Sequence, residues 1–146
     1  GERVPALTLP NLNGAPLPLG GPEGRAQLVF FLSTTCPICK ALLPALKSIR
    51  DDEARWLDVV LASDGREALH RRLIETEDLG SFPYALSSEL GLTFKVAKLP
   101  FAVLIGPDGA VRAKGLVNSR EQLESLFTAS ETGIPSYQAA VAARLA

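Results

Sequence analysis

Two cysteines, Cys36 and Cys39, carry the clearest chemistry in this sequence. They are the only cysteines of the chain and stand in the order Cys-Pro-Ile-Cys. This spacing lets one helical turn bring the two sulfurs within disulfide distance. An apolar run over 28–32 precedes the pair, and an amphipathic helical pattern follows it. A cysteine pair between a strand and a helix is typical of a thiol–disulfide exchange site.

The helix that begins at this pair predicts different roles for the two thiols. Pro37 suits the first helical position, where the N–H that it lacks is not needed. Cys36 then becomes the N-cap, where free backbone N–H groups and the helix dipole favour thiolate. Cys39 lies one turn in. We therefore expect Cys36 to be the exposed nucleophile and Cys39 the buried thiol that resolves a mixed disulfide.

Two plainer interpretations of the cysteine pair stay open. A zinc site needs about four N or S ligands, and the chain offers a single histidine, His70, to join the two cysteines. A purely structural disulfide over so short a loop would stabilise the fold little. We expect no metal and no cofactor beyond the Cys36–Cys39 disulfide. His70 is expected on the surface of a helix, without a catalytic partner.

The apolar runs predict one central sheet. A helix joins the first two long strands, so these strands should be parallel. A tight turn at Pro107-Asp108-Gly109 makes the last two strands antiparallel. The expected strands cover residues 27–33, 56–62, 84–86, 101–105 and 110–114.

Helical patterns fill the segments between these strands. The helix over 66–74 is expected to have Asp64 as its N-cap and to bury Leu69 and Leu73. Ser119 and Gln122 have the spacing of a capping box. The expected helices cover residues 37–49, 66–74, 88–94 and 120–127, with one more over 136–145.

These elements predict one α/β domain, a central mixed β-sheet flanked by helices, with an N-terminal β-hairpin. Asn13-Gly14 marks the hairpin turn in a segment rich in proline and glycine. We assign residues 1–25 to the hairpin extension, 26–130 to the core and 131–146 to a C-terminal tail or helix of a single domain over 1–146.

The bulk composition narrows the possible partners. The chain has a net charge of −1, and its basic residues form no cluster, which argues against binding to nucleic acid. No apolar run approaches the roughly 20 residues of a membrane span.

The residues around the cysteine pair resemble the thioredoxin superfamily, as does Leu99-Pro100 before the strand over 101–105. In that superfamily the proline before this strand is cis and lies against the disulfide, so the resemblance implies the same for Pro100. It also implies that the backbone of Leu99 pairs with an extended substrate segment. Together with Pro37 and Ile38, these residues form the expected substrate-binding surface.

A narrower resemblance is to the MauD family of methylamine-utilisation proteins. It is carried by the opening GERVPAL, by STTCPICK over 33–40 and by KGLVNSREQLESLF over 114–127. The resemblance implies an oxidoreductase that forms or isomerises disulfides during methylamine dehydrogenase maturation. The implied partners are a disulfide-containing exported protein, such as the small subunit of that dehydrogenase, and a redox partner that recycles the cysteines. It also implies an upstream membrane anchor and a place at the periplasmic face of the inner membrane.

One position departs from the superfamily pattern. Thioredoxins carry a buried acid six residues before the first cysteine, and this chain has Phe30 there. That acid helps the second cysteine to lose its proton, so Cys39 must lose its proton by another route.

The sequence leaves two alternative functions open and disfavours a third. A periplasmic reductase of the cytochrome c maturation type shares the fold and the motif. A non-catalytic docking module could use the apolar rim of Ile38, Leu99 and Phe101. A peroxidase is disfavoured, because Val29 and Ser33 stand where peroxiredoxins carry proline and threonine.

Overall fold

One mixed sheet forms the centre of the molecule, in the strand order β5-β4-β3-β6-β7. The structure, a computed structural model, describes residues 2–21 and 24–132. The first three strands in space are parallel, and β6 runs antiparallel to both β3 and β7. The strands are β3 (Ala26–Phe31), β4 (Leu57–Ser63), β5 (Tyr84–Leu86), β6 (Phe101–Ile105) and β7 (Val111–Leu116).

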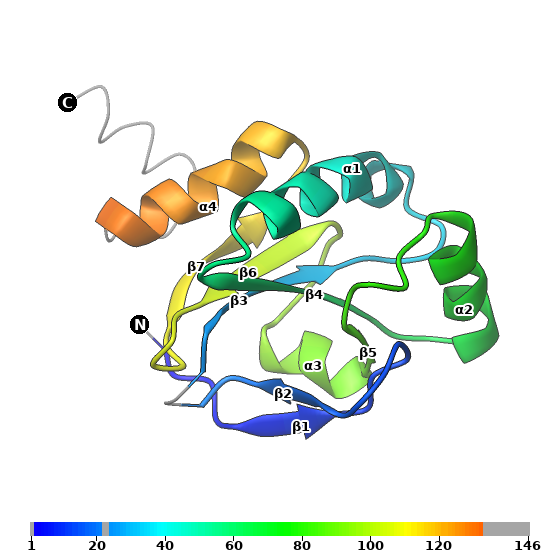
Figure 1. Cartoon of the computed structure of the whole chain (residues 1–146), viewed down its shortest axis with the longest axis horizontal. Coiled ribbons are helices and arrows are strands. Elements are labelled where there is room, and N and C mark those ends of the chain that lie inside the picture. The colour runs from blue at the N-terminus through cyan, green and yellow to red at the C-terminus, as the bar shows by residue number, and fades with distance from the viewer. Residues whose placement is uncertain (1, 22–23, 133–146) are drawn as a thin grey trace.

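Helices and a hairpin cover the two faces of this sheet (Figure 1). Helices α1 and α4 lie on one face, where Phe30, Leu46 and Leu123 belong to one buried cluster. Helix α3 and the hairpin lie on the other face, against Phe31. The helices are α1 (Pro37–Asp52), α2 (Glu67–Thr76), α3 (Ser88–Thr93) and α4 (Arg120–Thr132).

The N-terminal hairpin consists of β1 (Leu7–Leu9) and β2 (Leu17–Leu19), which pair antiparallel. Its inner residues Leu17 and Leu19 are buried against the sheet. The side chain of Gln27 on β3 also holds the hairpin. Its Oε1 accepts the Gly20 N–H at 2.9 Å, and its Nε2 donates to the Pro18 carbonyl at 2.9 Å. The predicted hairpin is confirmed, and its prolines stay outside the central sheet, whose ladders need every N–H.

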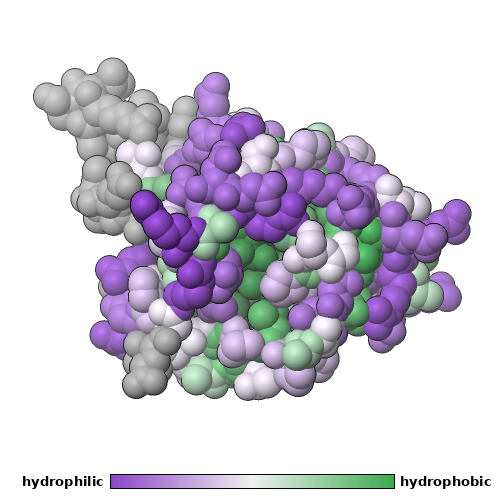
Figure 2. All heavy atoms as spheres, in the orientation of Figure 1, coloured by the Kyte–Doolittle hydropathy of each residue, from purple (hydrophilic) through white to green (hydrophobic). Residues whose placement is uncertain are grey.

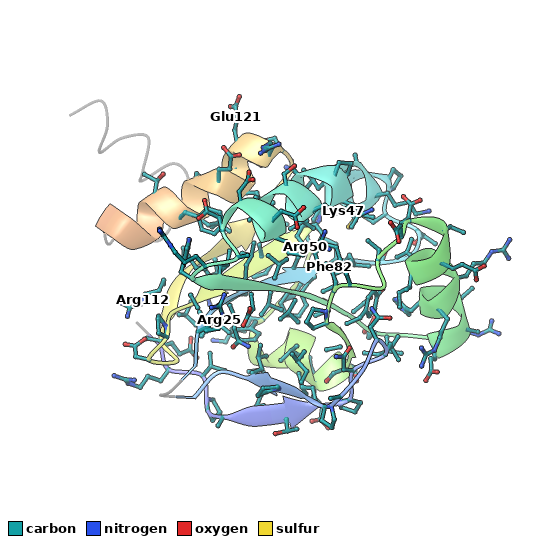
Figure 3. The ribbon with its side chains drawn as sticks, in the orientation of Figure 1. Arg25, Lys47, Arg50, Phe82, Arg112 and Glu121 are labelled. Atoms are coloured by element: carbon teal, nitrogen blue, oxygen red, sulfur yellow. A yellow bond between two sulfur atoms is a disulfide. The ribbon has the colours of Figure 1, made fainter. Side chains whose placement is uncertain are left out.

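Two cations of α1 hold the segment that leads into β5 (Figure 3). The guanidinium of Arg50 stacks over the Phe82 ring, 4.4 Å from its centroid. Lys47 Nζ donates to the Glu77 carbonyl at 2.8 Å. This irregular segment is therefore attached to α1 by side chains rather than by a backbone ladder.

Apolar residues reach the surface in the middle of the face shown in Figure 2, between polar side chains. A hollow of about 360 Å³ lies there between β2 and the first half of β4. Pro18, Val59 and Pro83 are among the residues that line it. This hollow lies away from the cysteine pair.

The predicted strands and helices are present, with shifts of a few residues at their ends. Trp56 is not part of β4. It lies in the preceding turn, donates its indole N–H to Glu53 and contacts the Phe127 ring at 5.6 Å. The predicted Ser119 cap is confirmed, because its Oγ accepts the Gln122 N–H at 3.2 Å. The predicted helix over 136–145 lies outside the described residues.

Three predictions for α2 were wrong. Its N-cap is Arg66, and Asp64 gives no side-chain cap. Leu69 is 46% exposed, whereas His70, expected on the surface, is 2% exposed. The helix is rotated so that His70 and Leu73 face the core. The helical period was correct, but the assignment of the inner face was not.

Two hydrogen bonds explain how an imidazole is buried here. His70 Nδ1 lies 2.6 Å from the Tyr84 hydroxyl, and Nε2 lies 2.7 Å from the Asp64 carbonyl. Burial raises the pKa of Tyr84, so its hydroxyl stays protonated and donates a hydrogen bond to Nδ1. Nε2 then carries the imidazole hydrogen and donates to Asp64. The pair joins α2 to β5 and to the loop after β4.

We predict that Tyr84→Phe destabilises the protein by about 1–3 kcal/mol, because it leaves a buried imidazole nitrogen without a partner. Urea unfolding at neutral pH measures the change. Leu92→Ala is the control, since Leu92 is 78% exposed and should change the free energy of unfolding by less than about 0.5 kcal/mol. Equal stability of Tyr84→Phe and the unsubstituted protein would contradict this account.

Candidate active site

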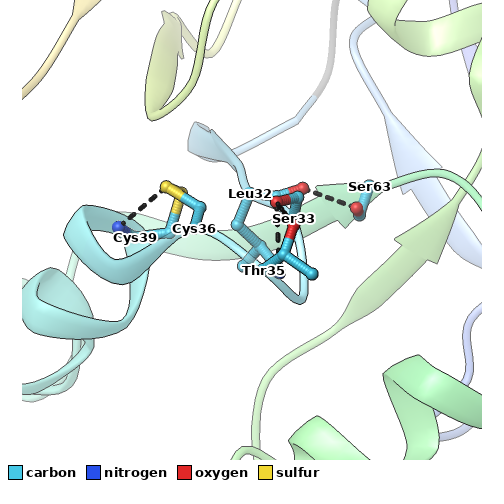
Figure 4. Close-up of a disulfide and its surroundings, with 6 residues drawn as sticks. All are labelled: Leu32, Ser33, Thr35, Cys36, Cys39 and Ser63. Carbon is cyan, nitrogen blue, oxygen red and sulfur yellow. Dashed lines mark hydrogen bonds between the residues drawn. A yellow bond between two sulfur atoms is a disulfide. The ribbon is translucent and has the colours of Figure 1, made fainter.

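The cysteine pair lies where β3 ends and α1 begins (Figure 4). Cys36 is the N-cap of α1 with an extended backbone (φ −97°, ψ 106°), and Pro37 is the first helical residue. The Cys39 N–H donates to Cys36 Sγ at 3.1 Å. The two cysteines form a disulfide with their Cα atoms 5.2 Å apart. The geometry predicted from the Cys-Pro-Ile-Cys order is therefore present.

The two sulfurs differ in their access to solvent. Cys39 is 1% exposed and belongs to the buried cluster beneath α1. Cys36 is half-buried, and its neighbour Ile38 is 45% exposed. A partner's sulfur can therefore approach Cys36 but not Cys39.

Hydrogen bonds from neighbouring elements position the loop before Cys36 (Figure 4). The Ser63 hydroxyl, buried at the end of β4, donates to the Leu32 carbonyl at 2.5 Å. Ser33 accepts two further hydrogen bonds. Its carbonyl accepts the Cys36 N–H at 3.5 Å, and its side-chain Oγ accepts the Thr35 N–H at 3.4 Å. Sequence reasoning missed Ser63. Its signal was a hydroxyl at the end of the mostly apolar strand β4, which the sequence predicts to lie beside the strand before Cys36.

The Leu99–Pro100 peptide bond is cis, as the resemblance implied. Phe101 pairs with Phe31 across β6 and β3, so the residues just before β6 and just after β3 leave the sheet at the same edge. Leu99 is 37% exposed, and Pro100 is buried, with its carbonyl accepting the Val117 N–H at 3.1 Å. All six expected site residues thus lie at or beside one edge of the sheet.

Phe30 is fully buried in the same cluster as Cys39. The position at which thioredoxins carry a carboxylate therefore holds a hydrocarbon ring. It can neither accept a proton from Cys39 nor place a negative charge beneath the disulfide. The groups that the structure offers to stabilise a Cys36 thiolate are the Cys39 N–H and the N-terminus of α1.

His70 is not available as a ligand, since both of its ring nitrogens are hydrogen-bonded. Over residues 2–21 and 24–132, no three His, Cys, Asp or Glu side chains are grouped so that they could hold a metal ion.

Known proteins are similar to this chain over most of its length. The methylamine utilization protein MauD of Paracoccus denitrificans is 42% identical over 146 residues, which are 99% of this chain and 72% of that protein. MauD of Methylorubrum extorquens is 42% identical over 140 residues, 94% of this chain and 67% of its own. The chain belongs to the MauD family. No protein-family model matches the sequence.

Solved structures of similar shape confirm the thioredoxin-like fold of this MauD-family chain. A putative thiol:disulfide interchange protein DsbE from Chlorobium tepidum has a TM-score of 0.78 at 19% identity, covering 89% of this chain and 96% of that one. The thioredoxin domain of a thiol-disulfide oxidoreductase from Bacteroides vulgatus has a TM-score of 0.69 at 21% identity, covering 92% and 96%. The chain thus combines a thioredoxin-like fold with a Cys36–Cys39 disulfide at a helix N-terminus, the arrangement that thiol–disulfide exchange needs.

We predict that the Cys36 thiol titrates below about pH 7.5, against about 8.5 for a free cysteine, because its sulfur accepts a backbone N–H at the positive end of α1. Thiolate absorbance of the Cys39→Ser variant across pH isolates this group. Alkylation by iodoacetamide, followed over the same pH range, should give the same midpoint. A midpoint above about pH 8 would rule out thiolate stabilisation by the helix.

Proposed function

We propose that this chain exchanges disulfides with exported protein partners, with Cys36 as the attacked and attacking sulfur and Cys39 as the resolving thiol. One observation carries the proposal. The Cys36 sulfur is accessible and accepts the N–H of Cys39, while the Cys39 sulfur is buried one helical turn away. An accessible, stabilised thiolate makes both a good leaving group and a good nucleophile.

Disulfide donation follows in two steps from the oxidised form. A partner thiolate attacks Cys36 Sγ, a partner–Cys36 bond forms, and the Cys36–Cys39 bond breaks to release the Cys39 thiolate. The partner's second thiolate then attacks its own half of the mixed disulfide. The partner's disulfide forms and the Cys36 thiolate leaves. Two electrons pass from the partner to the cysteine pair, and the two partner protons go to solvent or to the new thiols.

The reduced pair can also isomerise a wrong disulfide. Cys36 thiolate attacks one partner sulfur and releases a partner thiolate, which then attacks another partner disulfide. No net electron transfer occurs when the partner finally displaces Cys36. After disulfide donation, by contrast, a more oxidising disulfide protein must accept two electrons from the cysteine pair. This is the redox partner in the proposed cycle.

Partner binding is proposed at the edge of the sheet beside the disulfide. Pro37 and Ile38 form the exposed rim on one side, and Leu99 with the cis Pro100 forms the other. The Leu99 backbone N–H and carbonyl take part in no hydrogen bond within the described structure. They are therefore free to pair with an extended partner segment, as a strand pairs with a sheet edge.

The biological role we propose is disulfide formation or isomerisation during methylamine dehydrogenase maturation. Its support is the relatives' shared name, methylamine utilization protein, at 39–42% identity. The proposed partner is the small subunit of that dehydrogenase, reached at the periplasmic face of the inner membrane. No helix within residues 2–21 and 24–132 is both long and apolar enough to cross a bilayer. The proposed domain is single and spans 1–146.

Trapping separates the two cysteine roles and distinguishes catalysis from simple docking. We predict that Cys39→Ser accumulates a mixed disulfide through Cys36, because the resolving thiol is gone. Non-reducing electrophoresis with mass spectrometry of the bonded peptide gives the readout. Cys36→Ser is the matched control and should trap nothing. Trapping through Cys39 would reverse the assigned roles, and full activity of Cys36→Ser in cells would favour the docking module.

The reduction potential of the cysteine pair distinguishes the donor or isomerase from a reductase. We predict a value of about −120 to −180 mV, because the N-terminus of α1 stabilises the reduced thiolate and no carboxylate lies at Phe30 to oppose it. Equilibration with glutathione buffers measures it. A value near −270 mV would favour the reductase of the cytochrome c maturation type.

A further inference from the structure

A hollow of about 270 Å³ lies beside the cysteine loop, between the start of α1 and one side of α2. Thr34, Thr35 and Lys40 line it from the loop and α1. Leu69, Arg72, Leu73 and Thr76 line it from α2, at the spacing of neighbours on one helix face. In Figure 1 the start of α1 and helix α2 lie at the same end of the sheet. We call this feature the Lys40–Arg72 hollow.

Both cations of the hollow lack a partner within the described structure. Arg25, Arg50, Arg71, Arg112 and Arg120 each form an ion pair. Neither Lys40 nor Arg72 forms an ion pair or a side-chain hydrogen bond among the described residues, and no carboxylate lines the hollow. Two like charges held near one hollow leave an attraction for anions that the chain itself does not satisfy.

The hollow is continuous with the segment that carries the nucleophile. Thr35 directly precedes Cys36, and Lys40 directly follows Cys39. A segment that enters the hollow from the disulfide therefore needs to extend only a few residues beyond its own cysteine. The other lining groups suit a peptide. The Thr34 hydroxyl can donate to a carboxylate, and Leu69, which is 46% exposed, offers an apolar contact.

We propose that the Lys40–Arg72 hollow binds an acidic segment of the protein substrate, a few residues from the substrate cysteine. This inference rests on the proposed exchange reaction and adds the charge of the preferred substrate. It places a binding contact on the α2 side of Cys36, opposite the edge formed by Leu99 and Pro100. Exposed complementary charges act chiefly on the association rate, so the preference should weaken as salt rises.

Three cysteine-pair peptides test this charge preference. Each is a reduced dithiol peptide with the same core and with glutamate, glutamine or lysine flanks. The measurement is the second-order rate constant for oxidation of each peptide by the oxidised protein at low ionic strength. Each rate is divided by the rate of the same peptide with a small neutral disulfide, which removes the effect of the flanks on thiol reactivity. The unsubstituted protein should oxidise the glutamate peptide fastest, and about 0.5 M salt should largely abolish the difference.

Charge reversal then assigns the preference to the hollow. Lys40→Glu and Arg72→Glu should each lower the normalised rate for the glutamate peptide by about three- to tenfold. The rate for the glutamine peptide should change less than about twofold. Arg55→Glu is the matched control. It makes the same charge change at an exposed residue just before β4, at the opposite end of the sheet, and should leave the glutamate preference intact.

Several outcomes would overturn the proposal. Equal normalised rates for the glutamate and glutamine peptides would remove the preference itself. Lys40→Glu and Arg72→Glu could instead lower the normalised rates of the glutamate and glutamine peptides equally and raise the titration midpoint of Cys36. That result would mean that the two cations stabilise the Cys36 thiolate and do not bind the substrate. If Arg55→Glu also lost the preference for the glutamate peptide, the preference would come from the net charge of the protein and not from the hollow. Circular dichroism checks folding, and Arg72→Gln gives a milder variant with the same expected direction.

These results separate this inference from the proposed function. If the unsubstituted protein oxidises none of the three peptides, the exchange reaction fails. If it oxidises all three without charge preference, the reaction stands and the acidic-segment site alone is wrong.

Discussion

The pairing of Phe31 with Phe101 fixes where everything at this site can lie. It joins the last residue of β3 to the first residue of β6. The Phe31 ring also contacts the rings of Phe94 and Phe101, at 6.0 and 6.4 Å between centroids. These three rings thus form an aromatic cluster at the end of the sheet that carries the cysteine pair. A shift of register by one residue would turn every side chain of β3 to the opposite face, moving Phe30 and Phe31 between the two cores.

In the proposed function, backbone groups at the start of α1 stabilise the Cys36 thiolate. The N-terminus of α1 supplies the N–H and the positive end of the dipole, and Phe30 stands where thioredoxins place a carboxylate behind the disulfide. Ser63 contributes indirectly, because its hydroxyl holds the Leu32 carbonyl at the start of the loop. In this proposal, the reactivity of Cys36 depends on its position at the turn from β3 into α1.

Much of this arrangement could be predicted from the sequence because it depends on local patterns. The apolar run of β3, Pro37 at the first helical position and Ser119 at a capping position each determine structure within a few residues. The thioredoxin-like topology and the cis Pro100 came from family resemblance. Neither spacing nor composition would have given them.

The failures had a different physical origin. Apolar periodicity assigns leucine to the inner face of a helix, so it placed Leu69 inside and His70 outside. His70 is buried because Tyr84 and Asp64 supply its hydrogen bonds, and both belong to other elements. The Lys40–Arg72 hollow was missed for the same reason. Its two cations lie on different helices, 32 positions apart in the sequence (72 minus 40).

The covering of both sheet faces bears on when, in the proposed reaction, a partner protein can exchange its disulfides. Helices α1 and α4 cover one face of the sheet, and the hairpin with α3 covers the other (Figure 1). Cys36 is partly exposed at the end of the sheet where β3 leads into α1. Under the proposed exchange reaction, a folded partner whose thiols are buried cannot bring them to Cys36. In the proposed reaction, a partner therefore presents its cysteine on an extended segment that can pair with the Leu99 backbone. Exchange in this scheme must therefore take place before the partner folds and buries its cysteines.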